Sequence, residues 1–189
     1  MKKLTKLLSS FLAFAMILAL SVSALAADTT YTITIDGSGT EADHTYEAYQ
    51  IFAGDLHESD AADREENVLH NKILSNIVWG SGVDQERVVD GKTLADTFDG
   101  KTAAQVAESL STTADAREFA KKVAPYLAAH TDSTGKSDDG DYQISGLAAG
   151  YYLVKDQDNS MVDANDFYTA YMMKVVADVE AAPKGEKPT

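Results

Sequence analysis

The chain has 189 residues, a formal net charge of −14 at neutral pH and no cysteine. Because so acidic a chain repels nucleic acid and anionic lipid, we expect neither nucleic acid nor membrane as a partner of the mature domain. The lack of cysteine excludes disulfides, thiol catalysis and zinc–thiolate sites, so the fold must be stabilised by a sizeable core or by another crosslink.

The first 26 residues are typical of a secretory signal peptide. They begin with Lys2, Lys3 and Lys6, continue as an apolar run over 11–20, and end at the small-residue site Ala24-Leu25-Ala26. A retained membrane anchor is the alternative, although the apolar run is short for a span. Removing residues 1–26 leaves 163 residues with a net charge of −17, because three of the 16 basic residues and no acidic residue are lost. We predict one domain over 27–182, then a linker over 183–189 toward a further domain.

Two strands are predicted at the start of the mature domain. In 28–35, Tyr31, Ile33 and Ile35 alternate with threonines, which is the pattern of a half-buried strand. The stretch 45–56 is predicted to be the second strand. Its alternation is broken by the adjacent apolar residues at positions 51 and 52, so this strand is either covered on both faces or carries a bulge.

The middle of the chain predicts helices. A first helix that ends at Gly80 is indicated by apolar residues at helical spacing, namely Val68, Leu69, Ile73, Leu74, Ile77 and Val78. A second helix over 102–110 has Thr102 as its N-cap. A third begins at Thr113 or Asp115, and Pro125 should kink or split it.

The late part of the chain is predicted to return to strands. Residues 140–156 form two short strands joined by a tight turn over 146–150, and we expect this hairpin to organise the sheets. On its second strand Asp156 shares a face with Tyr152 and Val154, so it either ends the strand in solvent or extends a core-facing stripe. A long strand over 167–179 follows. Strands, then helices, then strands predict an α+β chain or a β-sandwich with a helical insertion.

Four segments together resemble the N-terminal domain of the major subunits of Gram-positive fimbriae, the sortase-assembled, isopeptide-forming pilins. They are HTYEAYQIFAGDL at 44–56, IVWG at 77–80, GYYLVKD at 150–156 after Gly146-Leu147, and YTAYMMKVVADV at 168–179 leading into APKGEKPT. The resemblance implies a mainly β fold, an immunoglobulin-like sandwich of the collagen-adhesin B type that is elaborated by helices between its early and late strands. It also implies a structural, non-enzymatic subunit in the pilus or cell wall of a Gram-positive bacterium. A pilus-class sortase would join this subunit covalently, head to tail, to other pilin subunits.

The resemblance further implies an acceptor lysine at the end of the domain. In the family, the sortase transfers the acyl group of one subunit to the lysine of a Pro-Lys pair, which Pro183 and Lys184 match here. In the family, the motif valine-x-valine-tyrosine stands directly before the Pro-Lys pair. Here the corresponding stretch, 179–182, reads VEAA, so only Val179 matches the motif. An acceptor amine must be exposed on a segment that can enter another enzyme's cleft. Lys187 and Lys174 are the alternative acceptors, and by composition alone Lys184 is an ordinary linker lysine.

The second chemistry of the family is an internal bond between a lysine of the first strand and an asparagine of the last, assisted by a buried acid. Asp156 matches the position of that acid in GYYLVKD. However, no lysine occurs in 28–71 and no asparagine in 167–179, and Asn165 lies just before the last strand. We therefore predict no internal bond. Asp156 would be a vestige of the acid position or a hydrogen-bond acceptor at the strand end.

Neither a metal nor a cofactor is predicted. The acidic loops at 138–141 and 156–159 lack the glycine and terminal glutamate of a calcium loop. The four histidines, His44, His57, His70 and His130, show no metal-ligand spacing. Two other functions remain open beside the pilus subunit. A surface adhesin module would bind a host protein or glycan, and a secreted hydrolase would need a cleft with convergent carboxylates.

Overall fold

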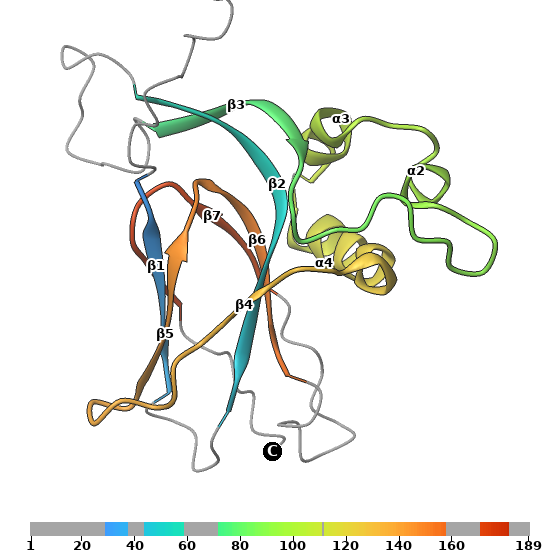
Figure 1. Ribbon diagram of the computed structural model, residues 1–189. Helices are drawn as coiled ribbons and strands as arrows, with labels where there is room; N and C mark the ends of the chain where they lie inside the picture. Colours follow the sequence, from blue (N-terminus) through green and yellow to red (C-terminus); the bar gives the residue numbers. More distant parts are fainter. Residues whose placement is uncertain (1–28, 38–43, 59–71, 111, 158–170, 182–189) are drawn as a thin grey trace, which may run out of the picture.

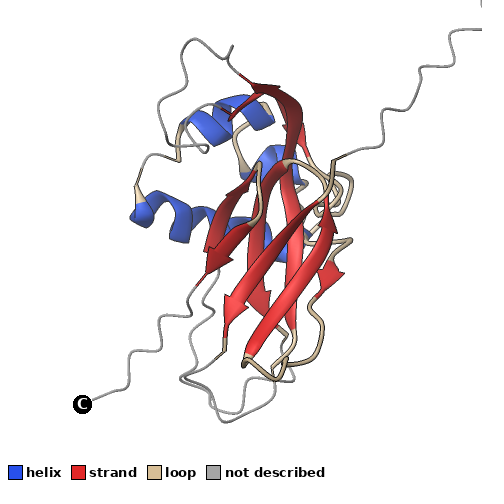
Figure 2. Cartoon of the chain, turned by 90° about the vertical axis from the view of Figure 1, so that its left-hand side faces the viewer, coloured by secondary structure: helices blue, strands red, loops and turns tan. Residues whose placement is uncertain are grey.

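The computed structural model describes residues 29–37, 44–58, 72–110, 112–157 and 171–181. The described chain forms two β-sheets, and its helices cover the outer face of the larger sheet (Figures 1 and 2). The prediction of a mainly β, sandwich-like chain is therefore confirmed at this level. None of the helices in the described ranges has the length and apolar character needed to cross a bilayer.

The smaller sheet has the order β5-β1-β8, in which β5 runs antiparallel and β8 parallel to β1. The larger sheet has the order β3-β2-β6-β7, with β4 paired to β2 outside this path. The strands are β1 (Tyr31–Asp36), β2 (Tyr46–Glu58), β3 (Lys72–Trp79), β4 (Thr131–Asp132), β5 (Asp141–Leu147), β6 (Gly150–Asp156), β7 (Tyr171–Val175) and β8 (Val179–Ala181). The helices between β3 and β4 are α2 (Leu94–Thr97), α3 (Ala103–Glu108), α4 (Thr113–Val123) and the 3-10 turn η2 (Ala124–Tyr126).

Two hydrophobic cores lie on the two faces of the larger sheet. The inter-sheet core joins buried side chains of β1 and β5, such as Ile33 and Ile144, to those of β2, β6 and β7. The helix-side core joins Phe52 and Leu153 of the larger sheet to buried residues of the helices, such as Phe119. Strand β6 is thus apolar on both faces because both faces are covered, as strands buried between two layers usually are.

The alternation predicted for the first strands is confirmed. On β1, Tyr31, Ile33 and Ile35 are buried and the two threonines between them are half-buried. On β2, the register against β6 shifts by one residue between Gln50 and Phe52. A bulge at this point explains why two adjacent side chains, at positions 51 and 52, both belong to the helix-side core.

The helix predicted to end at Gly80 is wrong where the structure describes it. Residues 72–79 form β3, which pairs antiparallel with β2. The register shifts there too, because the two residues between Ser75 and Val78 stand opposite one residue of β2, and the first of the two, Asn76, has a positive φ of 51°. Leu74 is buried and the next inward residue is Ile77, half-buried on the helix-side core. The bulge therefore places inward-facing apolar residues three positions apart in a strand. This spacing is typical of one face of a helix, so the sequence pattern indicated a helix.

The hairpin predicted over 140–156 is also wrong, although both of its strands exist. Strand β5 pairs with β1 in the smaller sheet, and β6 pairs with β2 in the larger one. Gly146, whose φ is +79°, lies within β5, where the register against β1 shifts between Leu147 and Ile144. A positive φ is one that glycine adopts without steric cost, so the glycine marks a bulge near the end of β5. The chain then crosses from the smaller to the larger sheet through Ala148 and Ala149.

The single long strand predicted over 167–179 is divided in the described part. Strand β7 ends at Val175 in the larger sheet, and β8 begins at Val179 in the smaller sheet. Asp178, in the crossing between them, accepts a hydrogen bond from the backbone N–H of Thr32 on β1 at 2.8 Å. The last strand therefore reaches the edge of the smaller sheet, beside the first strand.

The two later helices agree with the predictions. Thr102 caps α3 in a capping box with Gln105, and Thr112 caps α4 in the same way with Asp115. Helix α4 ends at Val123, and the chain continues as a 3-10 turn that contains Pro125, as expected where proline interrupts a helix. The short helix α2 was not predicted from the sequence.

Candidate functional site

The end of the described domain is the edge of the smaller sheet. Strand β8 runs parallel to β1, with Val179 opposite Ile33 and Ala181 opposite Ile35. Val179 is half-buried and packs against the inter-sheet core, so its role in the structure is to seat the last strand. The predicted acceptor Lys184, its neighbour Pro183 and the alternative Lys187 lie outside the described residues.

An open, acidic hollow lies beside the end of β8. Its volume is about 350 Å³, and its lining consists of Thr34, Asp36, Asp141, Glu180 and Ala181. Three of these five residues carry carboxylates, contributed by β1, β5 and β8. A cationic side chain near this end of the sheet is therefore attracted to its surface.

Lys174, the other alternative acceptor, lies on β7 in the larger sheet. Its Nζ donates a hydrogen bond of 2.6 Å to the backbone carbonyl of Lys72 on β3, and its side chain is half-buried. An amine held in this way is less accessible to a second enzyme than one on a linker. The geometry weakens Lys174 as an acceptor.

Asp156 lies at the end of β6, opposite Tyr46 on β2. Its Oδ2 is 2.6 Å from Nδ1 of His44, and both side chains are 18% exposed. The hydroxyl of Tyr142 accepts a hydrogen bond from the backbone N–H of His44, so the histidine is fixed between the two sheets. Asp156 therefore neither projects into solvent nor reaches the centre of the inter-sheet core. His44 was not expected from the sequence to be its partner.

The positions that carry the crosslinking lysine and asparagine in the pilin family would lie on the first and last strands. In the described parts of these strands, the facing pairs are Ile33 with Val179, Thr34 with Glu180 and Ile35 with Ala181. None of these pairs joins a lysine to an asparagine, so none can form the bond. Asp156 thus has His44 as a neighbour but faces no lysine–asparagine pair in the described strands.

A second polar group, which the sequence did not reveal, is centred on Glu47 of β2. Glu47 is 5% exposed and is the buried charged residue of the described chain. Its Oε2 accepts hydrogen bonds from the hydroxyl of Tyr49 at 2.6 Å and pairs with Nζ of Lys155 at 3.2 Å. Its Oε1 accepts from Nε2 of Gln157 at 3.2 Å and lies 3.7 Å from Nε2 of His130.

The surroundings of Glu47 favour its ionised form. Burial alone would raise the pKa of this carboxyl, but the hydrogen bonds from Tyr49 and Lys155, together with the charges of Lys155 and His130, lower the pKa below its usual value. His130 also lies 3.2 Å from Oδ1 of Asp132. Glu47, His130 and Asp132 each offer one ligand atom, and these atoms lie within 4.8 Å of one another.

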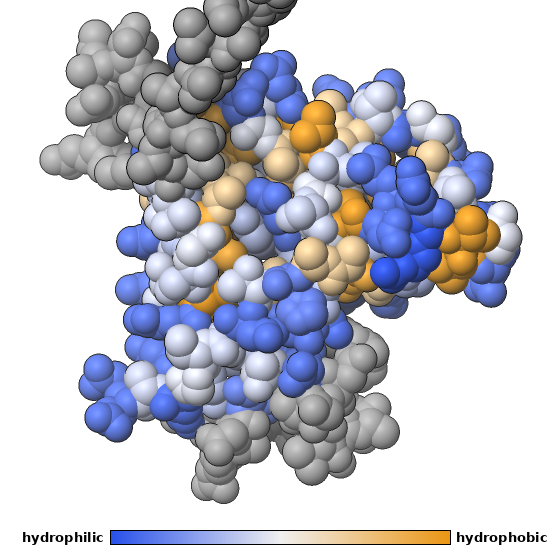
Figure 3. All heavy atoms as spheres, viewed as in Figure 1, coloured by the Kyte–Doolittle hydropathy of each residue, from blue (hydrophilic) through white to orange (hydrophobic). Residues whose placement is uncertain are grey.

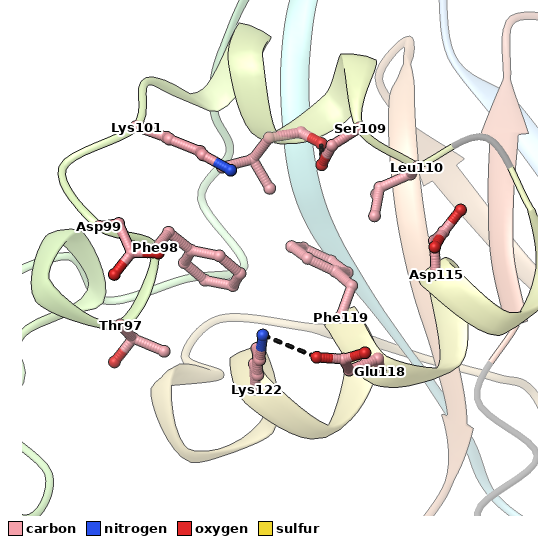
Figure 4. Close-up of a pocket in the computed structure, with 11 residues that line it drawn as sticks. Thr97, Phe98, Asp99, Lys101, Ser109, Leu110, Asp115, Glu118, Phe119 and Lys122 are labelled. Carbon is pink, nitrogen blue, oxygen red and sulfur yellow. Dashed lines mark hydrogen bonds and ion pairs between the residues drawn. The ribbon is translucent and has the colours of Figure 1, made fainter.

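A third feature is a hollow of about 220 Å³ among the three helices (Figure 4). The rings of Phe98 and Phe119 form its floor, with centroids 5.4 Å apart. Three of its charged groups are engaged within α4, because Glu118 pairs with Lys122 at 2.8 Å and Asp115 closes the capping box of the same helix. The two rings of the floor are themselves buried, so they contribute to the packing of the helices.

The surface around these features is mostly hydrophilic in the view of Figure 3, and hydrophobic residues appear as separate spots. The exposed large hydrophobic residues of the described chain are Ile73, Val78 and Val88.

Comparison with known proteins adds no assignment: no family model, no curated protein and no solved structure matches this chain. A function must therefore be argued from the sequence motifs and from the geometry described above.

Proposed function

We propose that this chain is the N-terminal domain of a structural pilus subunit, which a pilus-class sortase joins to other subunits through Lys184. The domain would not itself be an enzyme. It would be secreted through its signal peptide and would act at the surface of a Gram-positive bacterium, in the pilus or cell wall. The observation that carries the proposal is the position of β8, which runs beside β1 at a sheet edge and ends at Ala181, shortly before Pro183-Lys184.

Covalent geometry supports Lys184 as the acceptor. This lysine lies three positions after Ala181, the end of β8, and three residues of extended chain span at most about 11 Å. Lys184 is therefore joined to the last described strand by a short stretch of chain. An acceptor must combine such a fixed attachment with access to the cleft of another enzyme. Lys174 lacks that access because its amine binds the carbonyl of Lys72.

The finer features of the family belong to the same proposal. We take the two sheets as an immunoglobulin-like sandwich of the collagen-adhesin B type, and the segment from α2 to η2 as its helical insertion. In support, β1 and β8 are parallel neighbours, so the first and last strands lie side by side, as a crosslink between them requires in other members of the family. In their described parts those strands present no lysine–asparagine pair, which agrees with a domain that is polymerised but not crosslinked internally.

The experiment is an acceptor assay with the mature chain, residues 27–189. The chain is incubated with a pilus-class sortase and a sorting-signal peptide, digested, and mapped by mass spectrometry. We expect the peptide to be joined to Nζ of Lys184 and transfer to be lost in Lys184→Arg. Lys187→Arg is the matched control, because it lies in the same linker, and it should react as the unchanged chain does.

The same assay separates the pilus subunit from the surface adhesin module. Transfer to Lys187 in the unchanged chain would keep the function and move the site. If no lysine reacts while a known pilin acceptor reacts alongside, the chain is not a sortase acceptor. The adhesin hypothesis would then be taken up with a screen for host proteins and glycans.

A further inference from the structure

The polar group around Glu47 is built across three neighbouring strands. Asp132 of β4 pairs with Glu47 of β2 on one side, and Lys155 of β6 pairs with it on the other. His130 precedes β4 by one residue, and its ring lies 5.0 Å from the ring of Tyr49. The three side chains with ligand atoms thus come from two sequence regions that only the pairing of β4 with β2 brings together.

The distances fit one metal ion. Nε2 of His130 lies 3.2 Å from Oδ1 of Asp132 and 3.7 Å from Oε1 of Glu47. Ligand atoms bound at 2.0–2.1 Å to a tetrahedral zinc ion stand about 3.3–3.4 Å apart. The two separations that involve His130 bracket that value, and all three ligand atoms lie within 4.8 Å of one another. Small side-chain rotations would therefore bring all three atoms to bonding distance of one ion.

The carboxylate of Glu47 is oriented in advance for such a role. Tyr49 and Lys155 both hold its Oε2, while Oε1 accepts a hydrogen bond from Gln157 and lies 3.7 Å from Nε2 of His130. Partners that fix a ligand in this way commonly raise the metal affinity of a site. Lys155 also neutralises one of the two carboxylate charges, and the net charge of −1 that remains still favours a cation.

We propose that Glu47, His130 and Asp132 bind one divalent transition-metal ion, for which Zn²⁺ is the probe of choice. One imidazole nitrogen and two carboxylate oxygens form a ligand set that zinc accepts, and water would complete the coordination. The ion would tie β4, and with it the C-terminal end of the helical segment, to β2. In a chain without cysteine, such a metal-mediated link between strands would stabilise the fold as a disulfide does in other secreted proteins.

The test uses the mature chain without an affinity tag, because a polyhistidine tag would itself bind zinc. After treatment with a chelator, zinc is titrated in by calorimetry at neutral pH, and Tm is followed in parallel. We expect one saturable site per chain and a Tm that rises with zinc concentration. His130→Ala and Asp132→Asn should each weaken binding at least about tenfold.

Two variants serve as matched controls. His57→Ala removes an exposed histidine elsewhere on β2, and Asp139→Asn removes an exposed carboxylate outside the site. Both should bind zinc as the unchanged chain does, and binding to the unchanged chain should fall at pH 5, where protons compete for the imidazole. The inference fails if no saturable binding is seen. It also fails if His130→Ala binds as tightly as the unchanged chain. Neither result bears on Lys184.

Discussion

At the scale of single residues, Glu47 is the residue on which the polar contacts converge. Its carboxylate accepts hydrogen bonds from Tyr49 and Gln157 and pairs with Lys155. The side chains of Glu47 and Lys155 are 7% and 14% exposed, so water competes little for this pair. Removing one partner of a shielded pair leaves the other charge without compensation.

The substitution Glu47→Gln, studied with a chelator present, should lower the free energy of unfolding by about 1–3 kcal/mol at pH 7. The pKa of Glu47 is lowered in the folded state, so the folded state favours the ionised form. This contribution is fully present above the pKa of the unfolded chain and is lost as the pH falls through the folded value. Urea denaturation should therefore show a difference at pH 7 that shrinks below about pH 4. An equal difference at both pH values would contradict this assignment.

The sequence could not show these partners of Glu47. In the run TYEAYQ the glutamate is only the polar member of an alternating strand. One of its hydrogen-bond partners, Gln157, lies 110 residues further along the chain. Which side chain stands opposite another depends on strand order and register, which local patterns do not encode. Nothing in the sequence indicated a metal ligand at His130, because it has no metal-ligand spacing to the other histidines. In the structure its neighbours are the carboxylates of Glu47 and Asp132, which lie on two paired strands.

At the scale of elements, most strands and helices could be predicted, and the failure at β3 has a local cause. Local periodicity correctly indicated β1, β2, both strands of 140–156, and the capped helices α3 and α4. It failed for β3, where the shift of register at Asn76 changes the spacing of inward residues. A bulge alters periodicity without leaving a sequence signal as strong as that of a turn.

The junction after β3 gives a prediction at this scale. Gly82 donates its N–H to the carbonyl of Gln50 at 2.9 Å, and a Cβ at Gly82 would lie 2.5 Å from the backbone nitrogen of Gln50. A methyl group here would push the chain away from β2. Gly82→Ala should lower the free energy of unfolding by about 1–3 kcal/mol, measured by urea denaturation.

The matched control for this junction is Gly135→Ala. A Cβ at Gly135 would meet no atom within 4 Å, so the free energy of unfolding should change by no more than about 0.5 kcal/mol. Similar losses in the two variants would show that the effect comes from the flexibility of glycine and not from close contact with β2.

At the scale of the whole molecule, the chain changes sheet where the sequence suggested continuity. It crosses from the smaller to the larger sheet between β5 and β6, and back again between β7 and β8. Local patterns predicted a hairpin and one long strand. The reason is that alternation indicates which side chains of a strand are buried, but not which other strand it pairs with. The second crossing sets β8 beside β1, and this pairing gives the domain its C-terminal edge.

The pairing of β1 with β8 leads to a prediction about the mature chain. In the described strands Ile33 and Ile35 face Val179 and Ala181, so no amine meets an amide there. We expect the intact mass of the chain after signal removal to equal the mass calculated from its sequence, residues 27–189, without a crosslink. A mass lower by one molecule of ammonia would reveal an internal lysine–asparagine bond and overturn this expectation. Peptide mapping would then locate the bond.

The central claim, that Lys184 joins this domain to the next subunit, is tested most directly by the yield of the sortase reaction. The unchanged mature chain, Lys184→Arg and Lys187→Arg are compared by intact mass under the same conditions. Our account predicts that the unchanged chain and Lys187→Arg form the peptide adduct to the same extent and that Lys184→Arg forms none. An undiminished adduct with Lys184→Arg, or no adduct with any of the three chains while a known acceptor reacts, would contradict it.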